Sequence, residues 1–100
     1  MNDTDARPWV GPVLRVGVLS DVIVDVLRRS HPETRVVDRG SYLRVLAPHR
    51  CELGRAEVER ELGGPFVLPG DLEKVMPSFQ GTLSLTEERA VWSAHRERGA

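Results

Sequence analysis

The sequence is poor in the residues that most often carry chemistry in proteins. Its 100 residues include one cysteine, one lysine, one tyrosine and three histidines. These side chains usually supply acid–base, nucleophilic and metal-ligating groups, so the composition argues against a self-contained enzyme. The single cysteine, Cys51, excludes an internal disulfide and is typical of a reducing compartment. We therefore expect a cytoplasmic protein without catalytic residues of its own.

Several motifs and segments are also missing. No apolar run approaches the ~18 residues of a membrane span, and the polar N-terminus, MNDTDARPW, does not resemble a signal peptide. The net charge of -1 offers no overall cationic field for nucleic acid. There is no phosphate-binding glycine loop and no Glu-x-x-His pair for a di-metal site. His49 and Cys51 form the only close His/Cys pair, too few ligands for zinc. We expect no cofactor, no metal, no nucleic acid and no membrane.

Arginine is the one abundant basic residue. The chain has 14 Lys plus Arg residues, and one of them is lysine, which leaves 13 arginines. One interpretation is codon usage in a GC-rich genome. The other is selection of arginine for planar, bidentate contacts on a binding surface.

Two segments have the periodicity of helices that bury one face. Residues 21–29 read DVIVDVLRR, with apolar residues spaced for one helical face. Ser20 is a suitable N-cap for this helix, and Pro32 stops it. Residues 55–62 predict a second helix that ends at Gly63, because glycine readily adopts the left-handed conformation at helix C-termini.

The segments outside these helices are rich in valine, whose branched side chain favours strands. The link at Arg39 and Gly40 predicts a β-hairpin between two of them. Residues 72–76 fit a helical turn or a short strand, and residues 89–94 fit a helix and a strand about equally by propensity. Strands are predicted at residues 13–16, 34–38, 41–46, 51–53 and 79–85, and residues 66–68 are predicted to return to the core.

Together these elements predict an α+β fold, a small single-domain sandwich. The order is β-α-β-β-α-β-β, with two main helices packed on a mostly antiparallel sheet. A flexible N-terminal lead at residues 1–9 and a flexible C-terminal tail at residues 96–100 are expected to flank the domain at residues 10–95. The second face of such a sheet must be covered by solvent or by a partner.

Five side chains that could carry function have ordinary structural interpretations. Cys51, beside a strand, predicts a buried and inert thiol. His31 at a helix end is explained by the helix dipole or by solvent exposure, and His95 is expected at the surface. Trp9 and Trp92 are either lids over the edge of the core or interface anchors, since tryptophan is enriched at binding hot spots.

Five segments, in order and with near-matching spacings, resemble the MmoB/DmpM family, the small effector proteins of bacterial soluble di-iron monooxygenases. The likeness is closest to the effectors of toluene and phenol hydroxylases. One of the segments, residues 57–66, is similar to the family pattern E-E-x-L-G-[RK]-P-[FW]. The segments are VGPVLR at residues 10–15, a helix ending at Pro32, VDR with YLRV at residues 37–39 and 42–45, EVERELGGPF at residues 57–66, and SFxG at residues 78–81.

The resemblance implies a cofactor-free effector that does no chemistry itself and docks on the hydroxylase component above its di-iron site. It implies control of substrate access, oxygen activation and coupling in the hydroxylation of an aromatic or other apolar organic substrate. It also implies a second partner, the electron-transfer component, with competing or sequential binding. The same resemblance favours a strand over a helix at residues 89–94.

Nine positions within the segments that match the family are candidates for the partner interface. Among them, Arg15, Arg39 and Arg44 are the better candidates for direct contact. Three others are expected to shape the fold: Gly11, Phe79 and Gly81. The full set is Gly11, Pro12, Arg15, Asp38, Arg39, Arg44, Ser78, Phe79 and Gly81.

Two alternatives stay open at the level of sequence. The same order of elements describes ferredoxin-like regulatory domains that bind a small molecule. A small cofactor-independent enzyme would instead use Cys51, His49 or His95 as its reactive group.

Overall fold

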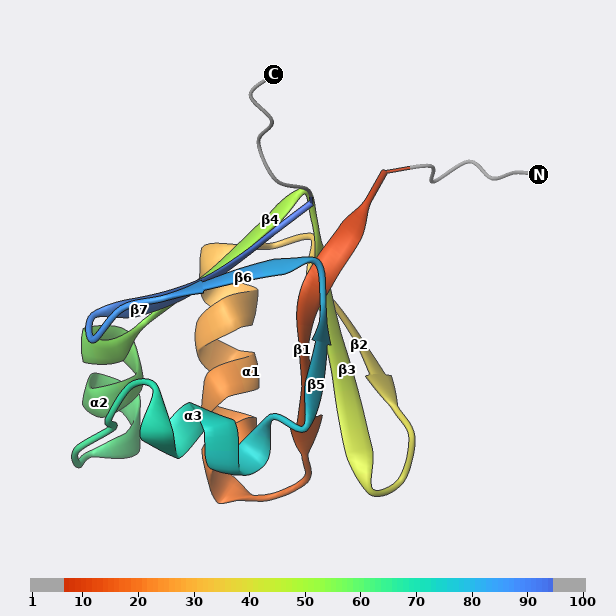
Figure 1. Cartoon of the computed structure of the whole chain (residues 1–100). Helices are drawn as coiled ribbons and strands as arrows, with labels where there is room; N and C mark the ends of the chain where they lie inside the picture. The colour runs from red at the N-terminus through yellow and green to blue at the C-terminus, as the bar shows by residue number, and fades with distance from the viewer. Residues whose placement is uncertain (1–6, 95–100) are drawn as a thin grey trace.

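The computed structural model describes residues 7–94 (Figure 1). They form three helices and seven strands, and the strands make up two antiparallel sheets. The larger sheet has the order β2-β3-β1-β5, and the smaller has the order β4-β7-β6. The predicted α+β class is confirmed. The strands are Trp9–Arg15 (β1), Arg35–Asp38 (β2), Tyr42–Pro48 (β3), Arg50–Gly54 (β4), Ser78–Gln80 (β5), Thr82–Leu85 (β6) and Arg89–Ser93 (β7). The helices are Val18–Ser30 (α1), Arg55–Leu62 (α2) and Gly70–Val75 (α3).

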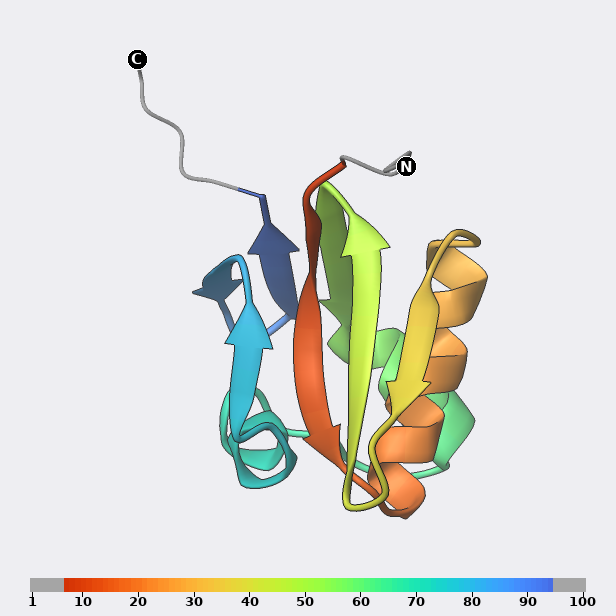
Figure 2. The same ribbon diagram turned by 90° about the vertical axis from the view of Figure 1, so that its right-hand side faces the viewer.

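The larger sheet is covered on one face only. Helix α1 packs on that face, where Val10 and Leu14 of β1 and Val45 of β3 are at most 2% exposed. Figure 2 views the sheet from the opposite side and shows that no helix of the described chain lies over this second face. Because successive side chains of a strand point to opposite faces, the residues between these buried ones point away from the core.

Helix α1 begins earlier than the sequence indicated. It starts at Val18 after Gly17, so the prediction that Ser20 caps it was wrong. Ser20 lies inside the first turn, is 1% exposed, and its hydroxyl donates a hydrogen bond to the backbone oxygen of Arg15. The hydroxyl therefore ties the helix to the end of β1, a contact that a local capping pattern does not reveal. The helix ends before Pro32, as predicted.

Helix α2 has the predicted bounds, and α3 resolves a choice that the sequence left open. Gly63 ends α2 in the left-handed conformation, with φ of 78°. The segment around Leu72 is helical, and Leu72 is fully buried. Phe66 and Leu68 reach the core as predicted, but Val67 between them is 57% exposed, so its assignment to the core was wrong. Neighbouring residues of this extended loop alternate in direction, and only two of the three face inward.

The strand predicted at residues 79–85 is two strands in different sheets, β5 and β6. Gly81 separates them with φ of 104°. A Cβ atom at Gly81 would lie 2.7 Å from the backbone oxygen of Ser93 and 2.8 Å from Cγ1 of Val10. Glycine alone fits this crossing. The prediction of one strand failed because the alternation of apolar residues continues across the break.

Trp92 lies in the centre of the core. It belongs to β7, which pairs with both β4 and β6 and confirms the strand that the family resemblance indicated. Its direct neighbours across the two pairings are Cys51 and Leu83. Trp92 is 0% exposed, so it is neither a lid at the edge of the core nor an anchor at an interface.

The N-terminal end of the described chain is held against the sheet. Strand β1 begins at Trp9, the last residue of the predicted flexible lead. The Trp9 ring is stacked by two guanidinium groups, of Arg35 at 4.2 Å and of Arg7 at 5.2 Å from its centroid. The predicted tail at residues 96–100, most of the lead and His95 lie outside the described residues.

Candidate functional site

The face of the larger sheet that no helix covers (Figure 2) carries arginine and apolar residues, as the strand register shows. The strand register places Arg44 of β3 in one row with Val37, Val13 and Ser78 of the neighbouring strands. Arginines with exposed apolar neighbours are typical of protein-binding surfaces. The outward side chains of this face are Trp9, Val13, Arg15, Arg35, Val37, Tyr42, Arg44, Leu46, Ser78 and Gln80.

One polar bridge crosses this face from β3 to β5. The Nη2 of Arg44 donates a hydrogen bond to Oε1 of Gln80 at 2.7 Å, and Nε2 of Gln80 donates to the backbone oxygen of Trp9 at 2.8 Å. Strand β1 lies between β3 and β5, so the Arg44 side chain reaches over it. Gly11 lies on β1 in this region and has no side chain to obstruct the bridge.

Gly11 is also required by the sheet itself. Its φ is 148°, and a Cβ atom there would lie 2.0 Å from the backbone oxygen of Val45. That distance is far inside any real carbon–oxygen contact, so β1 and β3 approach each other at this point only because Gly11 has no Cβ.

Exposed apolar side chains gather where β1 ends and the β2–β3 hairpin turns. Four of the six large hydrophobic residues recorded as exposed in residues 7–94 lie here or in the adjoining start of α1. The N–H of Val16 donates to the backbone oxygen of Ser41 at 3.2 Å, which joins the two turns. The four are Val16 (51%), Val18 (75%), Val37 (38%) and Tyr42 (39%).

The structure brings several of the predicted interface residues together at this face. Arg15 pairs directly with Tyr42, and Arg44 and Ser78 flank Val13. Arg15 and Ser78 are exposed, and Arg44 is half-buried beneath its bridge.

Two further candidates lie at the tip of the hairpin. Asp38 accepts a hydrogen bond from the N–H of Gly40 at 2.8 Å, which shapes the turn. Arg39 is exposed, and its N–H donates to the backbone oxygen of Tyr42 at 2.8 Å. Arg39 therefore stands at the end of the helix-free face, beside the exposed apolar group.

The other four candidates are not side chains of this face. Pro12 is fully buried beneath the sheet. Gly11 and Gly81 act through the backbone, as expected for fold determinants. Phe79 pairs with Pro12 and points to the opposite side from Ser78, yet it is 43% exposed, so it is not a core residue.

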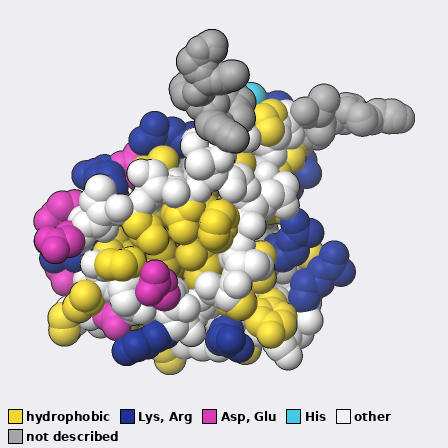
Figure 3. Space-filling model, viewed as in Figure 1, with side chains coloured by type: hydrophobic (Ala, Val, Ile, Leu, Met, Phe, Trp, Pro, Cys, Tyr) yellow, Lys and Arg dark blue, Asp and Glu magenta, His cyan; other side chains and the backbone are white. Residues whose placement is uncertain are grey.

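Phe79 borders a second apolar surface. Figure 3 shows apolar side chains gathered between β6, α3 and β5 on the side seen in Figure 1. Val75, Leu83 and Leu85 are partly buried members of the core in these elements. Strand β5 therefore separates the helix-free face from this apolar surface, with Ser78 turned to the first and Phe79 to the second.

Some surface residues were not found from sequence. Gln80 lies between two matched positions, Phe79 and Gly81, and nothing in its local pattern signalled the bridge to Arg44, which is 36 positions away. Tyr42 could have been found, because its alternation with Leu43 already indicated the exposed face of a strand.

Two side chains of types that often serve catalysis, Cys51 and His31, have structural roles here. Cys51 is 0% exposed, and burial raises the pKa of its thiol to about 12, which makes it unreactive at neutral pH. Nε2 of His31 accepts the N–H of Glu52 at 2.9 Å and so ties α1 to β4. The sequence predicted only dipole stabilisation or solvent exposure for His31. Neither explanation includes this hydrogen bond to Glu52. No cluster of three or more His, Cys, Asp or Glu side chains within residues 7–94 is arranged to hold a metal ion.

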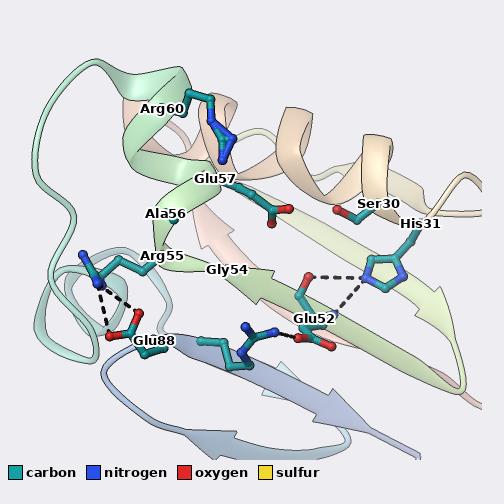
Figure 4. Close-up of a pocket in the computed structure, with 10 residues that line it drawn as sticks. Ser30, His31, Glu52, Gly54, Arg55, Ala56, Glu57, Arg60 and Glu88 are labelled. Atoms are coloured by element: carbon teal, nitrogen blue, oxygen red, sulfur yellow. Dashed lines mark hydrogen bonds and ion pairs between the residues drawn. The ribbon is translucent and has the colours of Figure 1, made fainter.

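A cleft of about 480 Å³ lies between the end of α1, β4 and the start of α2 (Figure 4). Its charges are largely neutralised by one another. Arg55 pairs with Glu88 at 3.0 Å, and Glu52 pairs with Arg50 at 3.0 Å and also with Arg89. Arg89 first, and then Arg50, lower the pKa of the Glu52 carboxyl. The cleft thus has the character of a surface ion-pair network.

The fold is that of a small α+β protein, and its helix-free face has the mixed apolar and arginine character typical of protein-binding surfaces. A model of the MmoB/DmpM family matches residues 9–93, and the chain belongs to this family. Members of the family are effector or regulatory components of monooxygenases, and this chain is one of them rather than a catalytic component.

The comparisons with individual proteins agree. The chain is 39% identical over 85 residues to an alkene monooxygenase effector subunit of Xanthobacter autotrophicus (strain ATCC BAA-1158 / Py2). The matched region covers 83% of each protein. Its fold is similar to a chain of a phenol hydroxylase–regulatory protein complex, with a TM-score of 0.77 at 15% identity over 85% of this chain and 97% of that one. It is also similar to the soluble methane monooxygenase regulatory protein B, with a TM-score of 0.65 at 17% identity over 94% of this chain and 70% of that one.

These findings support the effector interpretation over the ferredoxin-like alternative.

In the part of the chain that the structure describes, every helix is too short or too polar to span a membrane.

Proposed function

We propose that this effector binds the hydroxylase component of a soluble di-iron monooxygenase through the helix-free face of its larger sheet. The observation that carries the proposal is the cluster of exposed apolar residues and arginines on this face, around Arg15, Tyr42 and Arg44. The phenol hydroxylase complex, which by its name joins a hydroxylase and a regulatory protein, supports the choice of partner.

Docking on this face regulates substrate access, oxygen activation and coupling in the hydroxylase. An effector without chemistry of its own shifts a hydroxylase equilibrium only by binding one state more tightly than another. An interface of ~800 Å² per partner is sufficient for specific binding. The substrate is an aromatic or other apolar organic molecule, in keeping with the alkene and phenol systems of its relatives.

The interface uses the candidate residues in two ways. Arg15, Arg39, Arg44 and Ser78 contact the hydroxylase with their side chains. Phe79 contacts it where β5 forms the margin of the face. The residues that instead shape this surface from within are Gly11, Pro12, Asp38 and Gly81.

The electron-transfer component of the same system is the second partner. Its binding to the hydroxylase competes with that of the effector or follows it in sequence. The complex works in the cytoplasm, without a membrane or nucleic acid.

The test is to titrate the protein into its cognate hydroxylase and reductase and to record turnover, peroxide release and the dissociation constant. Tyr42→Asp is expected to weaken binding to the hydroxylase, because it places a charge in the apolar part of the face. Val67→Asp is the matched control, since Val67 is also an exposed hydrophobic residue, more exposed than Tyr42, but lies on the loop between α2 and α3. If the unaltered protein changes neither rate, coupling nor regioselectivity, the proposed function is refuted.

A further inference from the structure

Within residues 7–94, the Arg44 side chain is held by a neutral hydrogen bond and has no ion-pair partner. Its only recorded side-chain bond within residues 7–94 is to the amide oxygen of Gln80, and none of the ion pairs of this part of the chain includes Arg44. Gln80 is itself fixed by its bond to the backbone of Trp9. The arrangement differs from that of Arg55, which is neutralised by Glu59 and Glu88.

The bridge draws the Arg44 side chain across β1 towards β5. Neighbouring strands lie ~4.8 Å apart, so β3 and β5 are about 10 Å apart, a gap that the Arg44 and Gln80 side chains span together. Arg44 is half-buried as a result, whereas Arg15 on the same face is exposed. A guanidinium has five N–H donors, and the recorded bond to Gln80 uses one of them.

The residues beside Arg44 on the sheet are mostly apolar. The register places Val37 and Val13 on either side of Arg44 in its row, and Leu46 follows two residues further along β3. A cation in such surroundings gains most from a partner that both neutralises it and matches its planar fork. A carboxylate does both through two parallel hydrogen bonds.

We infer that Arg44 is the anchor of the effector's interface and binds an aspartate or glutamate carboxylate on the hydroxylase surface, and that Gln80 is the positioning residue that holds it ready. The inference rests on the proposed function and adds the chemistry of the partner's surface to it. Because the side chain is ordered before binding, less conformational entropy is lost when the complex forms. A neutral amide suits this task, since it orders the guanidinium and leaves its charge for the partner.

The experiment measures the dissociation constant of each variant for the cognate hydroxylase at several salt concentrations. Arg44→Ala is expected to weaken binding about tenfold or more and to reduce the salt dependence. Arg44→Lys is expected to lose most of the same affinity, because an ammonium group does not reproduce the planar fork. Arg28→Ala is the control, since Arg28 is exposed on α1, which packs on the other side of the sheet.

Gln80 gives the sharper test. Gln80→Ala frees Arg44 without neutralising it, so a loss of only about threefold is expected. Gln80→Glu keeps an acceptor for Arg44 but neutralises it within the effector, so this more conservative variant is expected to bind more weakly than Gln80→Ala. A merely structural role for Gln80 predicts the reverse order. Thermal unfolding of each variant verifies that the fold is retained.

Each outcome has one meaning. The inference is overturned if Arg44→Ala keeps full affinity, or if Gln80→Glu binds more strongly than Gln80→Ala. In either case the proposed function still stands, provided that the unaltered protein binds the hydroxylase. Full affinity of Arg44→Lys overturns the bidentate contact. An unaltered protein that fails to bind the hydroxylase overturns both.

Discussion

Replacing Gly11 by alanine is expected to be among the most destabilising single changes in this chain. The added Cβ would lie 2.0 Å from the backbone oxygen of Val45, and contacts below about 3 Å are not tolerated, so β1 and β3 must separate locally by about 1 Å. The φ of 148° adds a conformational cost, because a residue with a Cβ disfavours positive φ.

The magnitude follows from these two effects. Loss of about two hydrogen bonds between the strands costs roughly 2 kcal/mol, and the strained backbone adds about 1–3 kcal/mol. The sum, about 3–5 kcal/mol, is a large part of the ~5–15 kcal/mol that stabilises a domain of this size. In urea unfolding, with a slope of about 2 kcal/mol per molar, the midpoint should fall by about 2 M.

Gly40→Ala is the matched control for the Gly11 variant. Gly40 also has a positive φ, 87°, but no atom lies within 4 Å of the position of its added Cβ. It should therefore lose only the conformational part, about 1 kcal/mol. Equal midpoints for the Gly11 and Gly40 variants would refute the idea that close approach of β3 requires glycine at position 11.

Three further predictions concern the core and the ion-pair network. Cys51, whose burial raises its pKa to about 12, should not react with a thiol reagent at pH 8 in the folded protein, and rapid labelling under native conditions would contradict this. Arg89 lowers the pKa of Glu52 below 4.5, so Glu52 stabilises the folded state above that pH and loses its contribution as the pH falls through the lowered value. Glu52→Gln should thus cost less than about 1 kcal/mol at pH 7 and progressively less as the pH falls through the lowered pKa, and a pH-independent difference would argue against the pairing. Trp92→Phe should lie within about 1 kcal/mol of the unaltered protein in urea unfolding, because the lost packing is offset by removing a buried indole N–H that has no acceptor among the described residues. A loss above 3 kcal/mol would contradict this offset.

Local pattern predicted some elements well and others poorly. The bounds of α2 were correct because both the charged helical run and Gly63 lie next to each other in sequence. The start of α1 was misplaced because Ser20 has the chemistry of an N-cap but uses its hydroxyl on β1. The break at Gly81 was missed because the neighbours that require it, Val10 and Ser93, are distant in sequence.

At one segment, the family resemblance gave a better secondary-structure prediction than the local sequence pattern. Propensity alone left residues 89–94 undecided between helix and strand. The strand β7 lies between β4 and β6, and its partners supply the hydrogen bonds that decide the question.

The sequence by itself determined the scarcity of reactive side chains, the two main helices with the strands between them and the membership of an effector family. These follow from composition, from the periods of helix and strand and from short motifs, all of which are local. The tertiary structure alone decided that one sheet face stays free of helices, that Ser78 and Phe79 turn to opposite sides of β5, and that Arg44 is held by Gln80. Such features depend on strands that meet only after folding, and no local pattern records which residues will then be neighbours.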